Sequence, residues 1–370
     1  MAEANRLCTG VPGLDDLLGG GLIPGTLTVV CGATGIGKTQ LGVQFACRHT
    51  PCAVGNGETD GTRSVPATSV RRGSPDPAEG ADRRSPVSAI TGDLRSGNAG
   101  EVRRPAPNPR EVGRPAPNPD SGQVGNLSYD RGILLDMSSR GDSQSHAEYA
   151  KRLFNWKLTA VDPDAAVALD GFFDAGRNHG DYLHVFRYHG RRVTRRDLDW
   201  DDWNQWQAEL NARLRSAIAF FYGNFVQGCR RVVIDGIEPV DRPAESIQFN
   251  LFEYIYHQVL RKDPEWVARD LFREQYRRHA DEAAAHVYDP SQIGCLLLYT
   301  SQETMLDDLI SRPLDEGDVL SNANTLILMG KIRDGDHIRR ALYIAKHRGS
   351  ACEERIVPYA IGERGLTVEQ

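Results

Sequence analysis

The sequence predicts an α/β protein built on a mostly parallel, twisted sheet with helices on both faces. Unbroken apolar runs alternate with helical patterns, which is typical of parallel strands that are buried on both faces. A glycine-rich segment, GATGIGKT at 32–39, joins the first apolar run to the first helical pattern. The last two apolar runs have no helix between them, so they predict an antiparallel hairpin at one edge of the sheet.

Eight apolar runs are the predicted strands, and helical patterns separate the earlier ones. The runs are TLTVVCG (26–32), GILLDM (132–137), YLHVFRY (182–188), RVVIDG (231–236), GCLLLYTS (294–301), NTLILMG (324–330), RRALYIAKH (339–347) and ERIVPYAI (354–361). The predicted helices lie near 37–48, 143–157, 202–222, 244–261 and 263–286. Asp263 followed by Pro264 is a favourable start for the last of them, because aspartate caps a helix and proline suits its first turn.

One segment, 51–128, differs in composition from the rest of the chain. It has no Phe, Tyr, Trp or Lys, and it contains a direct repeat, EVRRPAPNP (101–109) and EVGRPAPNP (111–119). Such a composition cannot bury enough apolar surface to offset the entropy of ordering, so we expect a disordered Pro/Arg/Gly-rich insertion. The repeat fits either a polyproline-type recognition motif or neutral expansion of a tolerant loop. Residues 1–50 and 129–370 are then two parts of one domain, with extra helices at about 240–290.

Overall composition is that of a globular protein and excludes some functions. The formal net charge is −6, so no global charge attracts the chain to nucleic acid or to an anionic membrane. The seven cysteines include no CxxC pair, which favours reduced thiols over a disulfide framework or a zinc site. No apolar run approaches the length needed to span a membrane, and we expect a cytoplasmic protein.

The GATGIGKT segment has the composition of a phosphate-binding loop. Glycines let the backbone wrap closely around phosphate, and the helix that follows presents free N–H groups to the anion. In this pattern Lys38 reaches the β- and γ-phosphates and Thr39 ligates magnesium. The predicted nucleotide-binding residues are Gly32, Ala33, Thr34, Gly35, Ile36, Gly37, Lys38, Thr39 and Gln40.

Phosphoryl transfer also needs a carboxylate that holds magnesium at the end of a neighbouring strand. RVVIDG supplies Asp235 after three β-branched apolar residues. The predicted magnesium ligands are therefore Thr39 and Asp235, and the predicted cofactors are ATP and Mg²⁺.

Both ends of the chain resemble KaiC-like ATPases of the RecA superfamily. The segment CTGVPGLDDLLGGGLIPGTLTVVCGATGIGKT (8–39) is similar to the sequence that leads into the P-loop of that family. The segment RRALYIAKHRGSACEERIVPYAIGERGLTV (339–368) looks like its terminal strand, K-x-R-G-S turn and final hairpin. The resemblance implies a RecA-like fold for 1–50 and 129–370, with the P-loop in the first part.

What the resemblance further implies is an oligomeric site. In KaiC-like and RecA-like rings or filaments the nucleotide lies between subunits, and the K-x-R turn reaches the γ-phosphate bound by the neighbour. The matching residues here are Lys346 and Arg348. Ser301 and Gln302 follow a strand where the superfamily has a polar sensor of the γ-phosphate. Alternatively, the segment KHRG (346–349) is an ordinary basic turn with no role at a neighbour's nucleotide.

The sequence departs from the family where the catalytic residue is expected. RecA-like proteins usually have glutamate after the strand beside the P-loop strand, and KaiC-like members often have two. The matching positions here are Ser138 and Ser139. Serine orients a water molecule but does not accept its proton at neutral pH. Asp136, Asp142 and Glu238 are the nearby carboxylates that could substitute.

We therefore expect a slow ATPase that acts as a nucleotide-gated oligomeric switch, with Lys38, Ser138, Asp136, Gln302, Lys346 and Arg348 as candidate catalytic residues. A recombinase-like DNA-binding ATPase is the alternative, but the segment 303–322 after the sensor strand has six acids and one arginine and would repel phosphate. A third alternative is a scaffold whose degenerate site holds nucleotide without turnover.

Overall fold

A ten-stranded sheet organises the chain. The computed structural model describes residues 6–47, 132–138, 146–186, 199–238, 246–313 and 319–369, and the predicted insertion at 51–128 lies outside them. Within the described part the strand order is β10-β9-β8-β7-β1-β6-β5-β2-β4-β3. The strands are β1 (Leu27–Gly32), β2 (Ile133–Asp136), β3 (Ala160–Val161), β4 (Tyr182–His184), β5 (Arg231–Ile237), β6 (Gly294–Thr300), β7 (Thr325–Asp334), β8 (His337–His347), β9 (Val357–Gly362) and β10 (Gly365–Val368).

The sheet is parallel from β7 to β3 and antiparallel from β7 to β10. This confirms the predicted fold class, a mostly parallel sheet with an antiparallel C-terminal part. That part is larger than predicted, because β7 and β8 form a long hairpin and β10 adds a further strand. The expected closing pair, β8 and β9, is joined only at Ala341–Pro358 and Leu342–Val357.

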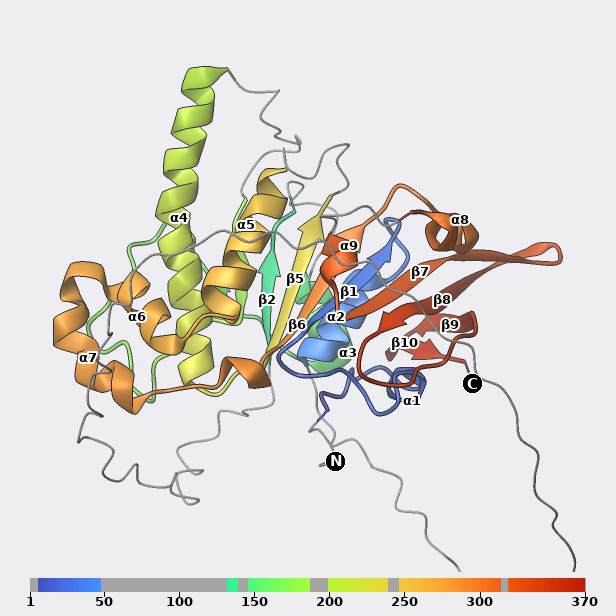
Figure 1. Cartoon of the computed structure of the whole chain (residues 1–370), viewed down its shortest axis with the longest axis horizontal. Helices are drawn as coiled ribbons and strands as arrows, with labels where there is room; N and C mark the ends of the chain where they lie inside the picture. Colours follow the sequence, from blue (N-terminus) through green and yellow to red (C-terminus); the bar gives the residue numbers. More distant parts are fainter. Residues whose placement is uncertain are drawn as a thin grey trace, which may run out of the picture. The chain divides into compact units, whose positions relative to one another are not determined.

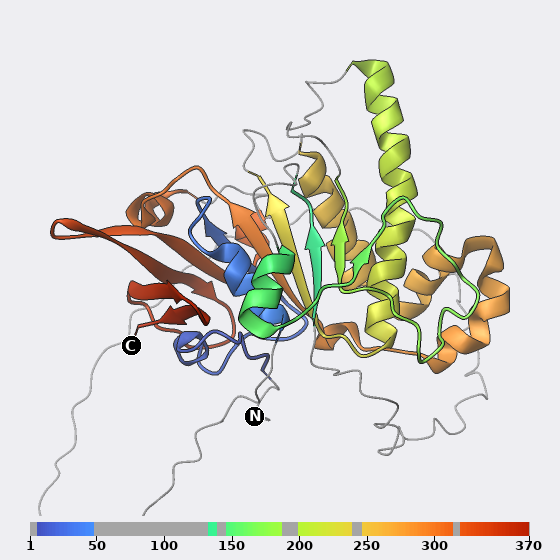
Figure 2. The same ribbon diagram turned by 180° about the vertical axis from the view of Figure 1, so that it is seen from behind.

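Helices cover both faces of the sheet. They are α1 (Leu14–Leu17), α2 (Lys38–Ala46), α3 (His146–Phe154), α4 (Trp200–Val226), α5 (Ile247–Ile255), α6 (Pro264–Phe272), α7 (Tyr276–Ala285), α8 (Leu306–Ser311) and α9 (Val319–Asn322). α5 lies in front of the strands in Figure 1, whereas α2 and α3 lie in front of them in the reverse view of Figure 2. Successive residues of β1 divide between the two cores: Val29 packs with the α4–α6 side, and Val30 with the α2–α3 side. The alternation follows from the two-residue period of a strand.

The helical region before β6 is more broken than its sequence pattern predicts. The expected helix at 263–286 is divided into α6 and α7 by a single turn at 273–275, where Arg273 has φ 48°. The expected helix at 244–261 ends as a π-helical turn over 256–260. The predicted start at Asp263 is confirmed, since its side chain accepts a hydrogen bond from the Glu265 N–H and Pro264 follows it.

None of the helices in the described ranges is both long and apolar enough to cross a membrane. The longest of them, α4, has 27 residues and carries Asp201 and Asp202 in its first turn.

A buried histidine, His179, lies in the segment between β3 and β4 and packs against α4. Its ring lies so close to Gly223 that a Cβ at that position would be 2.2 Å from His179 Nδ1. Phe172 packs against the same ring, with ring centroids 4.6 Å apart. Burial and the neighbouring charge of Arg177 lower the pKa of His179 to about 4, although a hydrogen bond to the Phe172 backbone opposes the shift.

We expect His179 to make the protein less stable in mild acid. The unfolded chain takes up a proton near pH 6.5 that folded His179 does not take up until about pH 4. Stability from this group is therefore present above pH 6.5 and is lost as the pH falls toward 4. Between pH 7 and pH 5, a His179→Leu variant should lose about 1 kcal/mol less unfolding free energy than the wild type, after allowance for solvent screening. Urea unfolding at both pH values measures the difference, and equal losses in the two proteins would contradict the assignment.

Candidate functional site

The predicted phosphate loop connects the carboxyl end of β1 to the start of α2. Gly32 ends β1 against β7, where a Cβ would be 2.2 Å from the carbonyl oxygen of Met329. Gly37 has φ 111°, and a Cβ there would be 2.6 Å from Ile361 Cδ1 on β9. Both positions therefore need glycine, one for the close approach of a strand and the other for the left-handed backbone that starts the helix.

Strand β9 also contacts the loop through a hydrogen bond. Tyr359 Oη donates to the carbonyl oxygen of Ile36 at 2.7 Å, and both residues are buried. Ile36 and Ala33 turn buried side chains inward, whereas Thr34 and Gly35 are exposed at the crest of the loop. The crest is thus the part of the loop that is open to a ligand.

Lys38 lies folded over the loop that precedes it. Its Nζ donates to the carbonyl oxygens of Gly32 and Ala33, both at 2.8 Å, and its side chain is buried. Burial lowers the pKa of Lys38, although the negative charge of Asp235 opposes the shift. The ammonium group is therefore held at the position where a phosphate-binding loop needs its cation.

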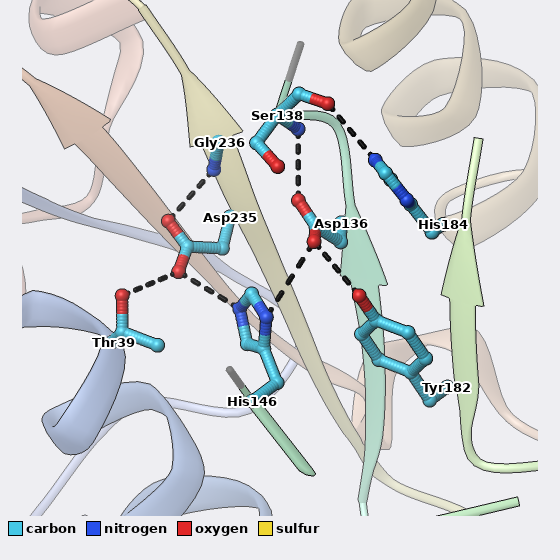
Figure 3. Close-up of polar contacts among 8 residues, drawn as sticks. All are labelled: Thr39, Asp136, Ser138, His146, Tyr182, His184, Asp235 and Gly236. Atoms are coloured by element: carbon cyan, nitrogen blue, oxygen red, sulfur yellow. Dashed lines mark hydrogen bonds and ion pairs between the residues drawn. The ribbon is translucent and has the colours of Figure 1, made fainter. Parts of the chain in front are cut away.

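Asp235 and Thr39 meet as the sequence pattern predicts. Thr39 Oγ1 donates to Asp235 Oδ2 at 2.7 Å, and the backbone N–H of Gly236 donates to Asp235 Oδ1, also at 2.7 Å (Figure 3). Only β6 separates β5 from β1 in the sheet, so the end of β5 lies beside the loop.

A hydroxyl and a carboxylate oxygen in contact are suitable oxygen ligands for magnesium. In the described part of the chain no group of three His, Cys, Asp or Glu side chains could hold a metal ion. A magnesium ion at Thr39 and Asp235 would therefore take its other ligands from nucleotide phosphates and water, as Mg²⁺ commonly does at phosphate sites. The donor set fits the predicted cofactor pair.

His146, at the start of α3, is a site residue that the sequence analysis missed. Its Nε2 lies 3.0 Å from Asp235 Oδ2 and its Nδ1 lies 3.5 Å from Asp136 Oδ2, so the ring bridges two carboxylates (Figure 3). The residue is only 3% exposed. No motif or spacing in the sequence marks it, because its role depends on where α3 packs.

Histidine and aspartate stabilise each other's charged forms in this cluster. Burial alone would lower the pKa of His146, but the Asp235 hydrogen bond and the charges of Asp235 and Asp136 raise it overall. Burial alone would raise the pKa of Asp235, but the hydrogen bonds and charges of His146, Thr39 and Lys38 lower it. The buried cluster is therefore a set of paired charges.

Asp136 lies directly opposite Asp235 on the neighbouring strand. Its Oδ1 accepts a hydrogen bond from the Ser138 backbone N–H at 2.8 Å, and its Oδ2 accepts one from Tyr182 Oη at 2.8 Å. The Ser138 carbonyl oxygen lies 2.9 Å from His184 Nε2. The structure thus brings Asp136 and Ser138 to the edge of the sheet where Asp235 lies.

The other carboxylates and the second serine near this edge differ in their placement. Glu238 follows β5, and its backbone N–H donates to the Gln248 side chain at 3.2 Å. Ser139 and Asp142 lie outside the described residues.

Ser301 and Gln302 follow β6, next to the P-loop strand. The Ser301 backbone N–H donates to the Gly32 carbonyl oxygen at 3.0 Å, and its hydroxyl donates to the Glu303 carbonyl oxygen at 3.1 Å. Ser301 is buried and Gln302 is exposed. Gln302 is therefore the more accessible of the two predicted sensor residues.

The phosphate loop lies where β1 ends. The predicted K-x-R turn lies at the other end of the parallel strands, where β7 begins. Lys346 pairs with the second residue of β7, whereas Gly32 pairs with Met329, further along that strand. Lys346 Nζ donates to the Ser321 carbonyl oxygen at 2.6 Å, and Arg348 is exposed. The structure therefore separates Lys346 and Arg348 from the P-loop of their own chain.

Removing the imidazole of His146 should destabilise the nucleotide-free protein. A His146→Leu variant leaves Asp136 and Asp235 buried without their shared partner, and breaking such a pair costs roughly 3 kcal/mol of unfolding free energy. Adding Asp136→Asn should recover part of the loss, since one buried charge is then removed. Urea unfolding at pH 7 measures both variants, and a change below about 0.5 kcal/mol in the single variant would contradict the buried charge cluster.

Gly32→Ala should be strongly destabilising. The new methyl group would overlap the Met329 carbonyl oxygen, so β1 and β7 must separate, and we expect a loss of about 2 kcal/mol or more. Gly176→Ala is the matched control, because a Cβ at Gly176 meets nothing within 4 Å. Denaturant unfolding of the two variants should differ clearly, and similar stabilities would show that the loop tolerates a side chain at Gly32.

Comparisons with known proteins agree with the P-loop assignment. The family profile described as "ATPase: KaiC" matches residues 7–52, a segment that includes the whole phosphate loop. No curated protein matches the chain.

Among solved structures, one similar chain is a KaiC-like protein from the hyperthermophilic archaeon Pyrococcus horikoshii OT3. The two chains are 12% identical, with a TM-score of 0.42, and the alignment covers 99% of this chain and 100% of that one. The profile match covers the first of the two segments on which the resemblance to KaiC-like ATPases rests.

Proposed function

We propose that the chain binds ATP with magnesium at the P-loop and hydrolyses it slowly as a nucleotide-gated homo-oligomeric switch. The observation that carries the proposal is the 2.7 Å hydrogen bond between Thr39 and Asp235. It joins the start of α2 to the end of β5 across 196 residues of sequence. In a magnesium–phosphate site the protein supplies a hydroxyl and a carboxylate that hold the ion and a lysine that binds phosphate, and Thr39, Asp235 and Lys38 are these groups in the proposal.

The residues of the loop have distinct roles in this proposal. The backbone N–H groups from 33 to 40 cradle the phosphates at the start of α2, where the helix dipole also favours an anion. Lys38 exchanges the carbonyl oxygens of Gly32 and Ala33 for phosphate oxygens. Thr39 and Asp235 hold the magnesium ion, which when bound neutralises charge on the phosphates.

Slow turnover follows from the groups at the end of β2. Ser138 is where the resemblance leads us to expect a catalytic glutamate, and a serine does not accept a proton at neutral pH. Asp136 is nearby, but both of its oxygens already accept hydrogen bonds and His146 lies against it. Positioning and charge stabilisation supply most of the catalysis in phosphoryl transfer, so we expect reduced rather than abolished activity.

An oligomer is proposed because Arg348 lies far from the P-loop of its own chain. Arg348 follows β8 beside Asn324, just before β7 begins, and Gly32 pairs with Met329, about five strand residues or ~17 Å further along. An arginine side chain does not span that distance, so Arg348 could act only on the nucleotide of a neighbouring copy. A head-to-tail arrangement, as a ring or filament, brings the two edges together.

DNA binding is less well supported than a nucleotide switch. After β6 the chain continues into α8, whose first turn carries Asp307 and Asp308, both exposed. Exposed carboxylates repel a phosphate backbone.

Lys38→Ala should abolish ATP binding and phosphate release. The wild type should bind ATP with magnesium, change its size in solution when it does, and release phosphate at a low rate. Isothermal titration, light scattering and a phosphate assay measure the three properties. Binding without phosphate release would reduce the protein to a nucleotide-holding scaffold, and a wild type that neither binds ATP nor changes its assembly would refute the proposal.

Mixing two inactive variants should restore turnover if the site is shared between copies. Arg348→Ala should bind ATP like the wild type but hydrolyse it at least tenfold more slowly, because the charge supplied to the neighbour is lost. In a mixture with Lys38→Ala, some interfaces combine an intact P-loop with an intact Arg348. Phosphate release above the sum of the separate variants is expected, and a strictly additive rate would argue that Arg348 does not act between subunits.

A further inference from the structure

Two glutamines on α2 lie one turn apart and so face the same side of the helix. Both polar atoms of the Gln44 side chain are hydrogen-bonded within the protein. Its Nε2 donates to the Leu366 carbonyl oxygen at 3.0 Å, and its Oε1 accepts from the Leu366 backbone N–H at 2.6 Å. These bonds attach α2 to β10. Gln40 therefore projects from the same side of α2, the side that faces β9 and β10.

Gln40 differs from Gln44 in its hydrogen bonding. The residue is only 8% exposed, yet its Oε1 has no hydrogen-bond partner among the described residues. Buried side-chain oxygens in folded proteins nearly always accept a hydrogen bond, and one that does not calls for an explanation. Its position two residues after Lys38 places it in the turn of α2 that cradles phosphate.

A nucleotide bound at the loop would account for the Gln40 oxygen if its nucleoside end lay on the Gln40 side. Thr39 faces Asp235 on β5, so a magnesium ion and the terminal phosphates would be held on that side of the loop. The nucleoside end would then extend away from β5. On the other side of β1 the loop is covered by β9, through Ile361 against Gly37 and Tyr359 against Ile36. Gln40 and the half-buried, apolar Ile361 lie on this second side.

We propose that Gln40 is a specificity-determining residue that recognises the nucleoside of the bound nucleotide. Its Oε1 accepts a hydrogen bond from an N–H or O–H donor, either the exocyclic amino group of adenine or a ribose hydroxyl. Ile361 supplies an apolar surface beside it. This inference rests on the proposed nucleotide binding. It adds recognition of the nucleoside, which the phosphate loop does not contact.

The test compares ligands that differ in one donor. Equilibrium binding of ATP, 2′-deoxy-ATP, 3′-deoxy-ATP and purine riboside triphosphate is measured for the wild type and for Gln40→Leu, each with magnesium. We expect Gln40→Leu to bind ATP about tenfold more weakly, because one buried hydrogen bond is lost. One of the three analogues should bind the wild type about tenfold more weakly than ATP and bind Gln40→Leu as ATP does. The identity of that analogue distinguishes the base from the sugar.

Inorganic triphosphate and protein stability are the controls. Triphosphate has no nucleoside, so Gln40→Leu should bind it as the wild type does. The nucleotide-free variant should be at least as stable as the wild type in urea, because the leucine leaves no buried acceptor without a partner. A merely structural glutamine would instead lower stability and leave the preference among the four nucleotides unchanged.

Other outcomes overturn the inference in distinguishable ways. If the wild type binds ATP and Gln40→Leu binds all four nucleotides with the same dissociation constants, Gln40 does not read the nucleoside, while the proposed function stands. Equal weakening for ATP and triphosphate would place Gln40 at the phosphates. A wild type that binds neither ATP nor triphosphate would refute the proposed function and this inference together.

Discussion

The buried carboxylate of Asp235 is the point on which the site depends. It accepts hydrogen bonds from Thr39 on α2 and from the Gly236 backbone, and His146 on α3 lies 3.0 Å from it. An ionised carboxylate with so little exposure is costly unless several donors surround it. The same requirement holds α2, α3 and β5 together at the carboxyl edge of the sheet. Stability and the proposed magnesium site therefore depend on the same group.

The C-terminal strands form the other side of the phosphate loop. Tyr359 and Ile361 contact the loop from β9, and Gln44 joins α2 to β10. The loop is thus supported by residues more than 300 positions later in the chain. Such support favours a single loop conformation before a ligand binds, which would reduce the entropy lost on binding.

The end of β2 combines groups that stabilise the protein with groups that are expected to limit its chemistry. His146 lies between Asp136 and Asp235, and Tyr182 and the Ser138 backbone donate hydrogen bonds to the two oxygens of Asp136. These contacts compensate two buried acids. Each oxygen of these two carboxylates already accepts a hydrogen bond, so neither is available to activate a water molecule without losing one.

Local patterns in the sequence determined the sheet, the phosphate loop and the strand-end position of Asp235. They could be predicted because apolar periodicity and glycine spacing act between residues that are close along the chain. The place of His146, the contact of Tyr359 with the loop and the burial of Gln40 were decided only by tertiary structure. So was the separation of Arg348 from its own P-loop, which follows from the antiparallel pairing of β8 with β7. Each of these depends on where distant segments pack, and no short stretch of sequence encodes that.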